Sequence, residues 1–260
     1  ARLPIVTDHV TCISTPGKDI DVLVTQGGIA VNPRRVELKE RLMDAGLPTS
    51  AVQLVSDTTR QSATELMKAN GYVDLLIPRG GAGLIRACVE NATVPCLETG
   101  TGICHIYVDE ECDFKMAKNI IINAKTSRPS VCNAAEKLLV NEKIAKDFMP
   151  FILKELRDTG VEVRGDESAI AYDNSIALAD EEEWYNEYLD YKIGVKVVKD
   201  IDEAIEHIDT HSTKHSEVII TKNADNAIRF QREIDSAAVY VNASTRFTDG
   251  GEFGLGAEIG

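Results

Sequence analysis

Short apolar runs alternate with helix-like segments along most of this chain, and that alternation limits the folds it can adopt. Residues 74–77 form a nearly continuous apolar run, as expected for a strand covered on both faces. Further strands are predicted at 52–55 and 94–97, with helical patterns at 60–69 and 84–90 between the three runs. This β-α-β-α-β order predicts a parallel sheet with crossover helices.

A second region of the same kind begins near residue 103. Its clearest segment is residues 143–158, an amphipathic helix followed by Gly160, which tolerates the positive φ of a helix end. Strands are predicted at 103–108, 161–163, 195–198, 218–221 and 238–241, and helices at 201–208 and 223–233. These segments predict a second α/β domain.

Composition excludes several classes of protein. The net charge of −14 argues against nucleic acid, whose backbone requires clustered Lys and Arg. No apolar run approaches the roughly 18 to 20 residues of a membrane span, and we expect no signal peptide from the first residues. The six cysteines lack CxxC pairing, so we expect reduced thiols, no metal site and a cytoplasmic location.

Residues 123–136, with the sequence Asn-Ala-Lys-Thr-Ser-Arg-Pro-Ser-Val-Cys-Asn-Ala-Ala-Glu, contain the strongest candidate for chemistry. Pro129 breaks the preceding helical pattern because proline restricts the residue before it. Cys132 then lies near the start of the next element, where unpaired backbone N–H groups could stabilise a thiolate and an oxyanion. The alternative is that Cys132 is a small buried hydrophobic residue.

The segment 123–136 resembles the nucleophile segment of gamma-glutamyl phosphate reductases, a branch of the aldehyde dehydrogenase superfamily. Residues 71–85, 93–109 and 240–260 resemble other blocks of the same family, in the same order and spacing. Together the blocks cover about residues 45–260. The resemblance implies an aldehyde-dehydrogenase-like α/β fold, with a partial dinucleotide-binding domain at 1–97 and an α/β catalytic domain at 98–260.

The resemblance also implies a reaction. Gamma-glutamyl phosphate reductases use NADPH to reduce L-glutamate 5-phosphate to L-glutamate 5-semialdehyde in proline biosynthesis, through a cysteine thioester. Cys132 matches that cysteine, and Asn133 follows it directly; the backbone N–H of Asn133 or that of Cys132 could face the oxyanion. Lys125 and Arg128 could lower the thiol pKa or bind substrate anions, and Arg246 matches a family position for substrate. A homo-oligomer is also possible.

Other positions match more loosely. Glu98 opens the loop Glu-Thr-Gly-Thr-Gly, which resembles the superfamily's Glu-Leu-Gly-Gly loop. In hydrolytic members of the superfamily the glutamate of that loop is a base that activates water. An acyl-phosphate reductase has less need of such a base, because thioester formation expels phosphate. Gly80, Gly81 and Gly83 lie between a strand and a helix, where backbone can approach a cofactor phosphate. Their spacing departs from the GxGxxG of classical Rossmann loops and by itself favours a tight turn, and the superfamily resemblance implies the cofactor contact. Glu187 aligns with the superfamily glutamate that binds the nicotinamide ribose.

Residues 1–48 resemble a different family, the C-terminal part of the citrate lyase alpha subunit, which is a coenzyme A transferase. Strands at 21–25 and 29–31 and a helix at 36–45 are predicted there. Two alternatives therefore stay open. The chain could be a truncated or chimeric, non-catalytic fragment of a reductase, because the family's first hundred or so residues have no counterpart here, or it could be a coenzyme A transferase component.

Three remaining features predict structure more than chemistry. His105 lies in a strand-like run and is expected to be structural. His211 and His215 are four residues apart, but nothing supplies further metal ligands. The acidic residues 180–183 are expected to form a solvated loop.

Overall fold

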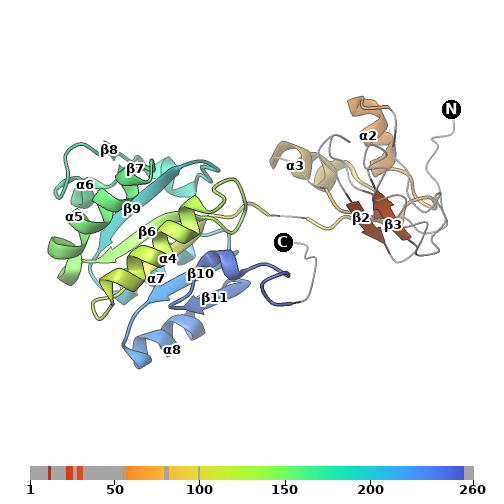
Figure 1. The fold of residues 1–260 in the computed structure, drawn as a ribbon. Helices are drawn as coiled ribbons and strands as arrows, with labels where there is room; N and C mark the ends of the chain where they lie inside the picture. The colour runs from red at the N-terminus through yellow and green to blue at the C-terminus, as the bar shows by residue number, and fades with distance from the viewer. Residues whose placement is uncertain are drawn as a thin grey trace. The chain divides into compact units, whose positions relative to one another are not determined.

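The structure is a computed structural model that describes residues 11–12, 22–25, 28–31, 55, 57–78, 82–98 and 100–254. Its chain separates into two compact units, Ala1–Thr99 and Gly100–Gly260 (Figure 1). The helix predicted at 36–45 and most of the strand predicted at 52–55 lie outside the described residues. Across the described part of the chain, no helix has the length and apolar character needed to cross a membrane.

The first unit contains short strands and two described helices. Strand β1 (Thr11–Cys12) pairs in parallel with β4 (Leu75–Leu76), and β2 (Val22–Thr25) pairs antiparallel with β3 (Gly28–Val31). Helices α2 (Arg60–Met67) and α3 (Ala82–Asn91) confirm the helical predictions for this region.

Apolar side chains from both described helices of the first unit meet in one cluster. The cluster buries Leu66, Met67, Val73, Leu76, Cys88 and Val94. Cys96 forms a parallel bridge with Leu76, which places the run predicted as a strand at 94–97 beside β4. The predicted parallel arrangement is therefore confirmed around β4.

A parallel sheet of seven described strands forms the centre of the second unit, in the order β11-β10-β5-β6-β9-β7-β8. The strands are β5 (Cys104–Val108), β6 (Ala135–Asn141), β7 (Glu162–Gly165), β8 (Ala177–Leu178), β9 (Lys192–Val198), β10 (Ser216–Ile220) and β11 (Ala238–Val241). This sheet confirms the α/β fold class predicted from the sequence.

The helices of the second unit begin at polar capping residues. They are α4 (Phe114–Thr126), α5 (Glu142–Asp158), α6 (Glu167–Ile170), α7 (Ile201–His211) and α8 (Ala224–Glu233), with 3-10 turns η2 (Glu181–Tyr185) and η3 (Thr245–Phe247). Side chains of Asp113, Asn141, Asp200 and Asn223 accept backbone N–H groups at the starts of α4, α5, α7 and α8. These contacts satisfy donors that a helix start leaves unpaired.

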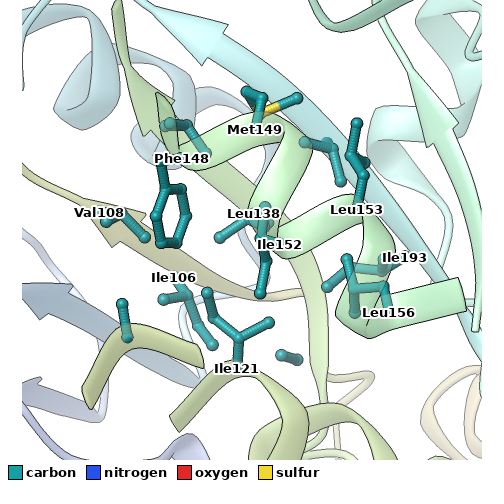
Figure 2. Packing of buried hydrophobic residues seen from close by; sticks show 14 of the residues in the cluster. Ile106, Val108, Ile121, Leu138, Phe148, Met149, Ile152, Leu153, Leu156 and Ile193 are labelled. Atoms are coloured by element: carbon teal, nitrogen blue, oxygen red, sulfur yellow. The ribbon is translucent and has the colours of Figure 1, made fainter. Parts of the chain in front are cut away.

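Side chains alternate between the two faces of the sheet and create two hydrophobic clusters. Ile106 and Leu138 pack with helices α4 and α5, as Figure 2 shows. Tyr107 and Leu139, their neighbours in sequence, pack on the other face with α7 and α8. Because both faces are covered, the central strands read as continuous apolar runs.

Two predictions for the second unit need correction. The element after Cys132 is strand β6, so no helix N-terminus supplies donors there; the Leu138–Val140 run is buried on both faces and therefore forms a strand. Residues 180–182 are exposed, as predicted, but the segment from Glu181 onwards forms the 3-10 turn η2 and not a loop. Asp180 and Glu183 form a capping box at the start of η2, and this turn buries Trp184 against the sheet.

Candidate functional site

Three loops of the second unit meet at one edge of the parallel sheet. Gly102 precedes β5, Cys132 precedes β6 and Glu187 precedes β9. Parallel strands place all their amino ends at the same edge, and β5, β6 and β9 are neighbours in the sheet. The order of strands therefore brings together residues that are up to 85 positions apart in sequence.

Gly102 contacts both of the other segments at this edge. A Cβ atom at this position would lie only 1.5 Å from the carbonyl oxygen of Cys132 and 2.7 Å from its Cα. The Gly102 N–H donates a hydrogen bond of 2.7 Å to Oε1 of Glu187. The Cys104 thiol donates to the same Cys132 carbonyl at 3.2 Å. Gly102 therefore joins the Glu187 segment to the backbone of Cys132.

Cys132 lies half-buried in the turn between α4 and β6. Ala134, two residues further on, donates its N–H to the carbonyl of Val131 at 3.0 Å and closes that turn. The predicted position between a helix and the next element is thus confirmed. The role of Cys132 as a nucleophile stays a prediction from the sequence.

Asn133 holds the segment after β11 against the Cys132 turn. Its Nδ2 donates to the carbonyl of Thr248 at 2.8 Å, and Nη1 of Arg246 donates to its Oδ1. Thr248 is fixed in turn by Ser216 at 2.6 Å and Tyr240 at 3.0 Å. Nε of Arg246 is buried without a hydrogen-bond partner among the described residues. Asn133 and Arg246, both predicted as site residues, therefore lie together.

Lys125 and Arg128 occupy different environments. Lys125 is fully buried, and its ammonium pairs with Oε1 of Glu136 at 3.0 Å. Burial lowers the pKa of Lys125, although the neighbouring Glu136 carboxylate opposes that shift. Arg128 is exposed just before Pro129. Lys125 thus already has a carboxylate partner, and the substrate-binding role of both residues stays a prediction.

Sequence reasoning missed two charged neighbours in β6 that fix the Glu187 segment. Glu136 and Lys137 are both fully buried. Oε2 of Glu136 accepts the N–H of Tyr188 at 2.9 Å, and Nζ of Lys137 donates to the carbonyl of Asn186 at 2.8 Å. Burial lowers the pKa of Lys137 to about 8. Two adjacent charges inside a strand covered on both faces are the signal that could have revealed them.

The remaining predicted site residues belong to the first unit. Glu98 is exposed at the end of the segment after Cys96, and Gly83 is exposed in the first turn of α3. Gly80 and Gly81 lie outside the described residues. Their predicted roles stay predictions.

Histidines near this edge are packed inside the second unit. His105 is fully buried, with Nδ1 2.9 Å from the carbonyl of Ile103 and its backbone N–H bonded to Glu217 at 2.7 Å. His207 and His211 stack with ring centroids 4.2 Å apart. No group of three or more His, Cys, Asp or Glu side chains suited to a metal ion occurs within the described ranges.

Curated proteins similar to this chain are gamma-glutamyl phosphate reductases. The relative from Clostridium beijerinckii is 59% identical over 252 residues, covering 96% of this chain and 60% of the relative. The relative from Clostridium perfringens strain 13 is 60% identical over 242 residues, covering 92% of this chain and 58% of the relative. The resemblance to gamma-glutamyl phosphate reductases is confirmed. The chain spans about 60% of the length of these relatives.

Solved structures give the same result. The gamma-glutamyl phosphate reductase of Thermotoga maritima is 56% identical, with a TM-score of 0.80, over 86% of this chain and 54% of that protein. A propionaldehyde dehydrogenase from Clostridium phytofermentans shares the fold, with a TM-score of 0.65 at 20% identity, over 85% of this chain and 58% of that one. The aldehyde-dehydrogenase-like fold is confirmed.

The N-terminal part has a second resemblance. A family model described as citrate lyase, alpha subunit, matches residues 1–72. This confirms the likeness predicted for residues 1–48 and extends it. The Clostridium beijerinckii reductase covers 96% of the chain, so similarity to reductases also reaches into residues 1–48. The comparisons therefore do not favour the coenzyme A transferase alternative.

Proposed function

We propose that this chain carries the nucleophile of an NADPH-dependent gamma-glutamyl phosphate reductase, which reduces L-glutamate 5-phosphate to L-glutamate 5-semialdehyde in proline biosynthesis. Identity of 59% to a curated reductase over 96% of the chain supports the proposal. The observation that carries it within the structure is Gly102, which contacts the backbone of Cys132 and binds Glu187.

The first step is acylation of Cys132. Its thiolate attacks the carbonyl carbon of the acyl phosphate, a C–S bond forms, and the bond to the phosphate oxygen breaks, so inorganic phosphate leaves with the electron pair. Gly102 packs closely against the Cys132 backbone and so restricts the position from which the sulfur attacks. The backbone N–H of Asn133 is proposed to face the oxyanion, because its side chain is already bonded to Arg246 and Thr248.

Arg246 is proposed to bind an anionic group of the substrate. Its Nε is buried without a hydrogen-bond partner in the described part of the chain, and its Nη1 is held by Asn133, next to Cys132. A buried unpaired donor is costly unless a ligand occupies it. Arg128, exposed at the start of the same turn, is a second candidate for this role, and Lys125 is the least accessible one.

The residues present fit a nicotinamide cofactor. Glu187 is half-buried, and within the described residues only its Oε1 is hydrogen-bonded, which leaves its second oxygen for a ribose hydroxyl. When bound, the cofactor supplies a hydride. A solved glyceraldehyde-3-phosphate dehydrogenase from Methanocaldococcus jannaschii, with a TM-score of 0.67 at 16% identity, was complexed with NADP. NADPH is our proposal here, with Gly80, Gly81 and Gly83 near its phosphates.

Residues of this chain also complete the second half of the reaction. Once the thioester carbon is reduced, the oxyanion collapses to the aldehyde and the thiolate of Cys132 is expelled, while Gly102 stays packed against the Cys132 backbone. Glu98, as the base that activates water in related enzymes, is not required for that release. We further propose that residues 1–97 contribute to cofactor binding, that residues 98–260 form the catalytic domain, and that the protein acts in the cytoplasm as a homo-oligomer.

The test follows the convenient reverse direction. The chain is mixed with glutamate 5-semialdehyde, NADP and inorganic phosphate, and NADPH formation is measured for the natural sequence and for Cys132→Ala. Cys112→Ala serves as the control because Cys112 lies after β5, at the opposite end of that strand from Gly102. We expect NADPH formation that only Cys132→Ala abolishes.

A second measurement separates acylation of Cys132 from hydride transfer. Acetyl phosphate, a small acyl phosphate, is incubated with the chain, and the acetyl group is located by mass spectrometry. Acetylation at Cys132 without NADPH formation would favour the non-catalytic fragment. Absence of both, in a folded chain, would contradict the assignment of Cys132.

A further inference from the structure

Adjacent charged residues of β6 hold one short segment from both faces of the sheet. Strand geometry directs Glu136 and Lys137 to opposite faces. Oε2 of Glu136 binds the Tyr188 N–H at 2.9 Å, while Nζ of Lys137 binds the Asn186 carbonyl at 2.8 Å. Between those two anchored residues lies Glu187, whose carboxylate accepts the N–H of Gly102. The segment 186–188 is therefore fixed immediately on both sides of Glu187.

The side chain of Lys137 reaches this segment by passing over Gly194 of the neighbouring strand, which has no side chain in the way. Its partner on strand β9 is Gly194, and a Cβ atom at Gly194 would lie 2.9 Å from Cδ of Lys137 and 3.0 Å from Trp184. The ammonium then lies 4.0 Å from the centre of the Tyr188 ring. The lysine is fully buried, yet among the described residues its nearest partners are one carbonyl and one ring face.

A buried ammonium of this kind is expensive for the fold. Removal from water disfavours its charged form, and no carboxylate forms an ion pair with it in the described part of the chain. Its second contact, the face of Tyr188, offsets that cost only in part. A lysine that serves stability alone would be expected to pair with an acid. Both contacts of Lys137 instead fall on the residues that flank Glu187.

We propose that Lys137, together with Glu136, is a positioning residue that holds the Glu187 carboxylate against the N–H of Gly102. Through Gly102 it also fixes the position of the Cys132 backbone. The same contacts orient the carboxylate that Glu187 offers to the cofactor ribose. The part concerning the ribose rests on the proposed function. The part concerning Gly102 does not, because it can be measured on the chain without substrate, cofactor or turnover.

The first measurement is hydrogen exchange at the Gly102 amide, read by NMR. In Lys137→Met, a substitution of similar shape, Glu187 loses one of its two anchors, and we expect exchange about tenfold faster, the effect of losing a hydrogen bond to a charged group. Lys192→Met is the matched control, because Lys192 lies 5.5 Å from the same Tyr188 ring but pairs with Glu162. We expect no change there.

A double variant then shows whether Lys137 acts through Glu187. Exchange at Gly102 is compared in Glu187→Ala and in Lys137→Met/Glu187→Ala. Equal rates in the two variants are expected, because Lys137 has nothing left to position once the carboxylate is gone. Rates that multiply would mean that Lys137 acts on Gly102 independently of Glu187, and would overturn the proposal.

The pH profile adds a readout that a merely structural residue would not change. The charged or titratable groups around Lys137 are Glu136 on its own strand, Tyr188 from the segment before β9, Lys125 from α4, Glu183 from η2 and His207 from α7. Burial raises the pKa of Tyr188, so its phenol stays protonated near pH 8. Burial keeps the pKa of His207 far below its ordinary value, so His207 is neutral near neutral pH. We therefore expect protection at Gly102 to fall as pH rises through about 8, where Lys137 loses its proton.

Three results together decide the proposal. Lys137→Met should speed exchange at Gly102, remove the step in the pH profile, and raise the midpoint of urea denaturation. A lower midpoint would show that Lys137 serves the fold alone. Unchanged exchange in Lys137→Met, or an equal increase in Lys192→Met, would also overturn it. Loss of reductase activity in every variant would bear on the proposed function and not on these results.

Discussion

Gly102 and Cys132 are in direct backbone contact, although they lie 30 residues apart in sequence: the position of a Gly102 Cβ would be 1.5 Å from the Cys132 carbonyl oxygen. Contacts below 3.0 Å between a Cβ and backbone essentially do not occur in real structures. The loop before β5 therefore cannot carry a side chain at this position without moving the turn that holds the proposed nucleophile.

Gly102→Ala should displace the Cys132 turn. Because the clash is with backbone, the chain must shift, and we expect a loss of about 1 to 3 kcal/mol in the free energy of unfolding, as for overpacked cores. We also expect at least a tenfold lower rate of Cys132 alkylation. Gly100→Ala is the matched control, since a Cβ there meets nothing within 4 Å. Equal behaviour of the two variants would contradict this account of the contact.

Cys132 should react faster with iodoacetamide near neutral pH than the other described cysteines. Burial raises the pKa of the Cys104 thiol, and that of Cys112 to about 11, so both are protonated at pH 7. Burial also raises the pKa of Cys88 and Cys96. Mass-spectrometric mapping of a time course checks the order. First labelling at Cys96, with Cys132 unreactive, would remove the central assignment.

Lys137→Met should stabilise the protein at neutral pH. The folded-state pKa of Lys137 is about 8, below its ordinary value of 10.5, so burial opposes the charged form. Between these values the unfolded chain binds more protons, and stability therefore rises with pH as Lys137 loses its proton. We expect the variant to gain about 1 to 3 kcal/mol at pH 7.

The gain in Lys137→Met should shrink as pH rises from about 8 towards 10.5, because the folded protein then holds a neutral lysine and burial no longer opposes a charge. Urea denaturation at a series of pH values measures this difference, and shifts of other groups cancel between the two proteins. A gain that stays constant with pH would show that packing, and not charge burial, causes it.

Arg246→Ala should weaken substrate binding more than it affects folding. Its guanidinium carries a buried N–H that has no hydrogen-bond partner among the described residues, and a hydrogen bond from a charged donor is worth about 1.5 to 3 kcal/mol. We expect glutamate 5-semialdehyde to protect Cys132 from iodoacetamide about 10- to 100-fold less well. Arg232→Ala, on the exposed side of α8, is the control. Equal protection in both variants would exclude Arg246 from the site.

Local sequence patterns determined most of the second unit. The apolar run 218–221 predicted a strand, which the structure has as β10 at Ser216–Ile220, and the spacing of apolar residues over 143–158 predicted helix α5, which the structure has at Glu142–Asp158. Gly160 has the positive φ of +78° that its place after that helix predicted. These features depend on side-chain period and on backbone freedom, which are local properties of the chain.

Local sequence patterns did not predict the structure where hydrogen bonds of polar side chains form a turn. Asp180 to Glu183 looked like a solvated loop, but a capping box and the burial of Trp184 make it a 3-10 turn against the sheet. Acidic residues next to the aromatic pair Trp184-Tyr185 give no period to recognise. Only the sheet, which supplies the apolar surface for Trp184, decides between the two outcomes.

By itself, then, the sequence determined the alternation of strands and helices, and it singled out Cys132, Asn133, Arg246 and Glu187 as candidates. Tertiary structure decided how they are combined. The strand order β5-β6-β9 brought Gly102 into contact with both Cys132 and Glu187, and it buried Glu136 and Lys137 on opposite faces of one strand. Such relationships depend on which strands become neighbours, and that choice is set by the global burial of apolar surface, which no single segment encodes.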